Sequence, residues 1–87
     1  MKLIDKVAVV TGGGSGIGEA ICHAYAQEGA TVIVADVNTE GAIRVANEIG
    51  RKAFSVEVDI SNRSKIRAMA ETVLSDHGHI DILVNNA

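Results

Sequence analysis

The chain has 87 residues, at most one small domain, and 47% of them are hydrophobic, so it is built to bury a core rather than stay disordered. A net charge of −3, scattered basic residues and only 2% aromatic side chains exclude a typical nucleic-acid binder and a polybasic membrane anchor. The apolar run near the N-terminus is too short for a signal peptide or membrane span, and one cysteine allows no internal disulfide. These features predict a cytoplasmic protein.

The first third of the chain predicts a strand, a helix and a second strand. Val7–Val10 and Thr31–Ala35 are continuous apolar runs, which are typical of strands buried on both faces of a parallel sheet. Between them, apolar residues recur at helical spacing over Ile17–Glu28, and Gly29 provides a stop. Within this helix Cys22 is expected to be a small buried hydrophobe.

The rest of the chain continues the alternation of helix and strand. A helix capped by Asn38 or Thr39 is expected to end before Gly50, and a strand follows over Ala53–Val58. Ser61 is expected to cap the next helix, and a last strand covers Ile80–Val84. The apolar stripe of that last helix consists of Ile66, Met69, Ala70, Val73 and Leu74. Each helical crossover requires parallel strands and a right-handed connection. The predicted fold class is therefore α/β, a Rossmann-like doubly wound parallel sheet in the order β-α-β-α-β-α-β.

Five glycines gather in the turn between the first strand and the first helix, from Gly12 to Gly18. Main-chain N–H groups and the positive helix end would point at a phosphate there, although a plain tight turn is the alternative. A nucleotide-triphosphatase loop is excluded because Glu19 and Ala20 occupy the places of its lysine and its Ser or Thr. The common Gly-x-Gly-x-x-Gly spacing also fails, because Ile17 stands where its last glycine belongs.

The spacing that remains is Thr-Gly-x-x-x-Gly-Ile-Gly over residues 11–18, and three further segments follow it in order: Asp36, Asp59-Ile60, and Asp-Ile-Leu-Val-Asn-Asn-Ala over residues 81–87. With these four segments the chain resembles the short-chain dehydrogenase/reductase family over its whole length. The resemblance implies the strand order 3-2-1-4 and a nicotinamide cofactor. It also implies that residues 1–87 are the N-terminal cofactor-binding part of one longer Rossmann-like dehydrogenase domain.

Asp36 favours NAD over NADP. It follows the second strand, 20 positions after Gly16, where a carboxylate accepts hydrogen bonds from the adenosine ribose and repels a 2′-phosphate. The nearby Ser15 and Val37 supply no cation, and Arg44 lies inside the second helix. A solvated turn residue is the alternative reading of Asp36. Methyltransferases that use S-adenosylmethionine have a similar layout and remain a remote alternative.

The resemblance implies roles for individual residues. Ile17 would offer its backbone N–H to the pyrophosphate, Asp59 would bind the adenine amino group, and Asn86 would line the ribose. Thr11 and Asn85 would have structural roles around the turn. The predicted cofactor-binding residues are Gly12, Gly14, Ser15, Gly16, Ile17, Gly18, Asp36, Val37, Asp59, Ile60, Asn86 and Ala87.

No catalytic residue is predicted within the chain. The family uses a serine and a Tyr-x-x-x-Lys pair, but Tyr25 is followed at that spacing by Gly29. The parent protein is expected to transfer hydride between NAD and a small alcohol or ketone, and to form dimers or tetramers. A truncated, non-catalytic binding or assembly module is the alternative. No metal site is predicted, since His77 and His79 have no third ligand near them in the sequence.

Overall fold

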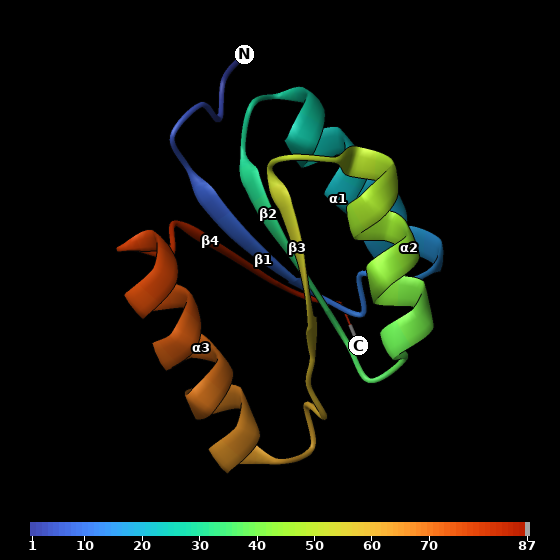
Figure 1. The fold of residues 1–87 in the computed structure, drawn as a ribbon, viewed down its shortest axis with the longest axis vertical. Helices are drawn as coiled ribbons and strands as arrows, with labels where there is room; N and C mark the ends of the chain where they lie inside the picture. The colour runs from blue at the N-terminus through green and yellow to red at the C-terminus, as the bar shows by residue number, and fades with distance from the viewer. Residues whose placement is uncertain (87) are drawn as a thin grey trace.

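The computed structural model describes residues 1–86. Its elements are β1 (Val7–Thr11), α1 (Gly16–Gln27), β2 (Thr31–Asp36), α2 (Thr39–Ile49), β3 (Ala53–Glu57), α3 (Arg63–His77) and β4 (Ile82–Asn85). The strands of this part of the chain pair in parallel in the order β3-β2-β1-β4. Helices α1 and α2 cover one face of the sheet and α3 lies on the other (Figure 1). The predicted fold class and strand order are confirmed.

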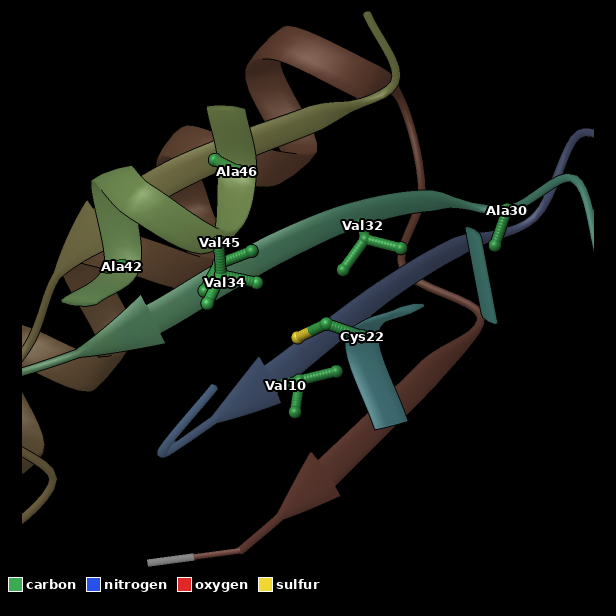
Figure 2. Close-up of a cluster of buried hydrophobic side chains, with 8 residues drawn as sticks. All are labelled: Val10, Cys22, Ala30, Val32, Val34, Ala42, Val45 and Ala46. Carbon is green, nitrogen blue, oxygen red and sulfur yellow. The ribbon is translucent and has the colours of Figure 1, made fainter. Parts of the chain in front are cut away.

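The two central strands form the middle of a core with two sides. Every residue of β1 is buried, and β2 is buried over its four central residues. Because strand side chains alternate between faces, the two sides receive different residues. The side that α1 and α2 cover is built from strand and helix residues together: Val10, Cys22, Ala30, Val32, Val34, Ala42, Val45 and Ala46 (Figure 2). The side that α3 covers contains Val7, Val9, Ile33, Ala35 and Val58, together with Met69 and Val73 of the helix itself.

The helix caps match the prediction for α2 but not for α3. The Asn38 side chain accepts a hydrogen bond from the Gly41 N–H at 3.2 Å, so one of the two predicted caps of α2 is confirmed. The predicted cap Ser61 is wrong, because its N–H and hydroxyl both donate to the Asp59 carboxylate. The next residue, Asn62, caps α3 through its side-chain oxygen.

Two further expectations need correction at the end of the chain. Strand β4 begins at Ile82 rather than Ile80. The reason is that the Val7 N–H donates to the Asp81 carboxylate at 2.8 Å instead of to a backbone carbonyl. Leu74 was expected in the apolar stripe of α3, but its side chain is exposed, and Met69 and Val73 are the buried residues of that helix. Within residues 1–86, no helix combines the length and apolar character that crossing a bilayer requires.

Candidate functional site

The carboxyl ends of the strands and the glycine turn surround a small hollow of about 80 Å³. Ligands of open α/β sheets bind at this edge of the sheet. The hollow is lined by Gly12, Asp36, Val37, Val58, Asp59 and Ile60. All of these except Val58 were predicted as cofactor-binding residues. Val58 was missed, and the only available signal was its place as the apolar residue before Asp59.

The turn itself is packed so closely that three of its glycines, Gly12, Gly14 and Gly18, leave no space for a side chain. A Cβ on Gly14 would lie 2.9 Å from both the Asp36 carboxylate and the Ala42 nitrogen, and a Cβ on Gly18 would overlap the Gly12 carbonyl oxygen. Gly16 has open space around it but a φ of +58°, a conformation that side chains other than glycine disfavour. The turn therefore offers bare backbone to a ligand.

Helix α1 begins where this turn ends. Ser15 precedes its first residue and makes no side-chain cap, so the first N–H groups of the helix have neither an intrahelical acceptor nor a capping oxygen from Ser15. The helix macrodipole adds partial positive charge at the same place. Ile17, in this first turn, is 74% exposed. The N-terminus of α1 is therefore suited to binding an anion such as a phosphate.

The Asp36 carboxylate is held at the wall of the hollow by backbone groups. One oxygen accepts from the Gly14 N–H at 2.9 Å and the other from the Asn38 N–H at 3.0 Å. An ionised carboxylate has about four acceptor positions, so capacity remains for further donors such as hydroxyl groups. Asp36 thus fixes the glycine turn and faces the hollow at once.

A second carboxylate, that of Asp59, lines the same hollow. The hydroxyl and N–H of Ser61 both donate to its Oδ1, at 2.7 and 3.0 Å. These hydrogen bonds from Ser61 hold the pKa of Asp59 below its ordinary value. The group is therefore ionised at neutral pH and acts only as an acceptor, as an amino-group partner requires.

Thr11 connects the end of β1 with the end of β4. Its hydroxyl donates to the Val84 carbonyl at 3.0 Å and accepts from the Asn86 N–H at 3.0 Å. The Asn85 side-chain oxygen lies 3.4 Å from the same hydroxyl. These contacts agree with the structural roles expected for Thr11 and Asn85, and they place Asn86 against the turn. The predicted site residue Ala87 lies outside the described residues.

Arg44 contacts the glycine turn, which the sequence did not predict. Its expected pair with Glu48 is present at 3.0 Å, but the guanidinium also binds Glu19 at 2.9 Å and the Gly14 carbonyl at 3.2 Å. The hydrogen bond from Arg44 holds the pKa of Glu19 below its ordinary value. The sequence carried no signal for this contact: in the structure Arg44 lies one helical turn after Gly41, which packs on the same glycine turn.

One cluster of metal-ligand types forms beside this arginine, where none was predicted. Glu19, His23 and Glu48 bring one ligand atom each within 4.8 Å of one another. Both carboxylates already bind Arg44, whose positive charge opposes a cation there. His77 and His79, the two histidines weighed as metal ligands from the sequence, have different partners in the structure. His77 packs on the Phe54 ring, and His79 pairs with Asp81.

Comparison with known proteins agrees with this geometry. The family model described as short chain dehydrogenase matches residues 6–87. The chain belongs to this family. The 7alpha-hydroxysteroid dehydrogenase of Escherichia coli K12 is 41% identical over 90 residues, which cover all of this chain and 35% of that enzyme. A crystal structure of 3-ketoacyl-(acyl-carrier-protein) reductase from Brucella melitensis complexed with NADH has a TM-score of 0.94 and 48% identity, and the match covers 98% of this chain and 35% of the reductase.

The relatives differ in length. The chain spans about a third of the length of the hydroxysteroid dehydrogenase and of the reductase. By contrast, it covers 84% of the short-chain dehydrogenase/reductase homolog YusS of Bacillus subtilis, with 37% identity over 91 residues. The family is therefore shared by relatives of very different length.

Proposed function

We propose that residues 1–87 are the NAD-binding, N-terminal portion of a single Rossmann-like dehydrogenase domain. The observation that carries the proposal is the placement of Asp36, held against the bare backbone of the glycine turn while it lines the hollow. The reductase of known structure that shares 48% identity with this chain is complexed with NADH. Both support a dinucleotide as the ligand.

In this proposal the cofactor is divided between two parts of the site. The pyrophosphate lies on the turn and the start of α1, where free N–H groups and the helix dipole favour negative charge. The adenosine lies in and above the hollow, where Asp36 accepts from the ribose hydroxyls and Asp59 from the adenine amino group. The pyrophosphate residues are Gly12, Gly14, Ser15, Gly16, Ile17 and Gly18, and the adenosine residues are Asp36, Val37, Asp59, Ile60, Asn86 and Ala87.

The same arrangement supports NAD rather than NADP. The Asp36 charge would oppose a 2′-phosphate at the ribose. Arg44 of α2, whose guanidinium contacts the turn, is bound by Glu19 and Glu48. Bound NAD would supply hydride chemistry, and the residues of this chain would bind and orient its adenosine and pyrophosphate.

Titration of the natural full-length protein with NAD and NADP tests this proposal. Asp36→Ala is expected to weaken NAD binding by about tenfold or more, because hydrogen bonds to a charged group are lost, and to narrow the preference over NADP. The matched control is Asp76→Asn, which removes an exposed carboxylate on α3 outside the hollow. It should change neither the dissociation constant of NAD nor that of NADP. Equal affinity of the unmutated protein for NAD and NADP would contradict the role of Asp36.

The whole protein is proposed to be a cytoplasmic, homo-oligomeric oxidoreductase that acts on a small alcohol or ketone. The one cysteine of the part of the chain that the structure describes is buried, which suits a reducing compartment. Its dehydrogenase relatives support the reaction class. The coding sequence after residue 87 is the direct check, because a serine followed by Tyr-x-x-x-Lys is required for turnover in this family. Sedimentation velocity of the full-length protein tests the oligomeric state.

A further inference from the structure

One side chain that the proposed function does not use, Arg44, joins three parts of the molecule. Its Nη2 donates to the Gly14 carbonyl at 3.2 Å and to Glu19 Oε1 at 2.9 Å. Its Nη1 donates to Glu19 Oε2 at 3.2 Å and to Glu48 Oε2 at 3.0 Å. The guanidinium thus contacts the glycine turn, the first turn of α1 and the last part of α2.

The Gly14 residue is held from two sides as a result. Its N–H donates to Asp36 at the end of β2, and its carbonyl accepts from Arg44 on α2. Helix α2 approaches so closely here that a Cβ on Gly41 would lie 2.7 Å from the Gly14 oxygen. Gly14 is followed by Ser15 and the first residues of α1, so its orientation sets the direction of the N–H groups that follow.

The charge of Arg44 matters as well as its hydrogen bonds. Glu19 lies in the first turn of α1, where its carboxylate is favourable to the helix dipole but would repel a pyrophosphate bound at the same end. Arg44 forms a two-point pair with this carboxylate, which is the arrangement in which arginine is most effective. Its positive charge offsets that of Glu19 next to the proposed pyrophosphate position.

We propose that Arg44 is a positioning residue for the cofactor: it orients the Gly14 peptide and offsets the negative charge of Glu19 beside the pyrophosphate. The inference rests on the proposed NAD site and adds a residue to it. It assigns Arg44 no direct contact with the dinucleotide. Because the guanidinium acts only at the turn, ligands with a pyrophosphate should depend on it and ligands without one should not.

Isothermal titration of the full-length protein with NAD, ADP-ribose and adenosine separates these effects. Arg44→Gln should weaken NAD and ADP-ribose by about tenfold, the value of one hydrogen bond to a charged partner, and leave adenosine within twofold. Arg44→Lys keeps the charge but not the planar fork, so an intermediate loss is expected. Arg51→Gln, an exposed arginine after α2, is the matched control.

A double variant tests the charge argument. In the Arg44→Gln background, Glu19→Gln removes the carboxylate that has lost its arginine partner and should recover part of the lost NAD affinity. Unchanged NAD affinity in Arg44→Gln, or an equal loss for adenosine, would overturn the inference even if the unmutated protein binds NAD. If the unmutated protein binds neither NAD nor ADP-ribose, the proposed function itself fails. Should Arg44→Gln fold poorly, Arg44→Lys supplies the same comparison, with an intermediate loss for NAD and ADP-ribose and none for adenosine.

Discussion

Cys22 lies directly beneath the glycine turn, with its Sγ 3.9 Å from the Gly13 carbonyl oxygen. Burial, with a smaller contribution from the nearby Glu19 charge, raises the pKa of this thiol to about 11. Only the thiolate is an effective nucleophile. The residue therefore serves packing, as its position among apolar neighbours in Figure 2 shows.

Alkylation with iodoacetamide at pH 8 measures the reactivity of the Cys22 thiol. The raised pKa lowers the thiolate fraction about a hundredfold relative to an unperturbed thiol, and burial slows access further. We expect mass spectrometry to show little labelling of Cys22 in the folded protein and rapid labelling in urea. Comparable labelling rates in the two conditions would show that Cys22 is accessible in the native state.

At this scale the sequence predicts identities better than contacts. Asp36 and Asp59 could be found because each directly follows a buried strand, and strand ends of a parallel sheet meet at one edge. The contacts of Arg44 with Glu19 and Gly14 span 25 and 30 residues, and they depend on how far a long side chain reaches across two helices. No pattern within a single element specifies such a contact.

At the scale of elements, the turn and α1 depend on one glycine inside the helix. In a helix, alanine is more favourable than glycine by about 1 kcal/mol, so Gly18→Ala would stabilise α1 if helix propensity alone mattered. A Cβ there would overlap the Gly12 carbonyl, and the turn must move to accommodate it. We expect Gly18→Ala to lower both stability and NAD affinity.

Gly16→Ala is the informative comparison, since nothing lies within 4 Å of a Cβ at that position and only the backbone conformation is strained. Its cost should be about 1 kcal/mol, the usual penalty for a side chain at positive φ. Urea unfolding and NAD titration of both variants would measure the difference. A Gly18→Ala protein as stable as the unmutated one would contradict the close packing of the turn.

Element boundaries show why the prediction from the sequence is incomplete at this level. Buried apolar runs and helical spacing predict all seven elements, because these patterns are local. The start of α3 and the start of β4 depend instead on where side chains bind. Ser61 binds Asp59 rather than capping α3, and Asp81 binds Val7 ahead of β4. Both choices involve residues outside the pattern.

For the whole molecule, stability rests on a thin core in which valine side chains predominate. Val34 is fully buried between β1, α1 and α2 (Figure 2). Val34→Ala removes two methyl-sized groups and leaves a small cavity, so the free energy of unfolding should fall by about 2 kcal/mol. The control Val37→Ala alters a side chain that is 65% exposed and should cost little. Urea denaturation of the two variants, with similar m-values, would measure the contrast, and similar losses would contradict it.

The hydrogen bonds of Thr11 have a consequence for the order in which the molecule assembles. Its hydroxyl meets Val84 and Asn86, which are 73 and 75 residues further along the chain. Contacts between such distant residues form late, because the intervening chain must first be brought together. During synthesis the turn emerges early, whereas its support beside Asn86 is among the last of these residues to leave the ribosome. The binding site therefore completes its folding only after β4 has been synthesised. A nascent chain that still lacks this strand should not bind the dinucleotide.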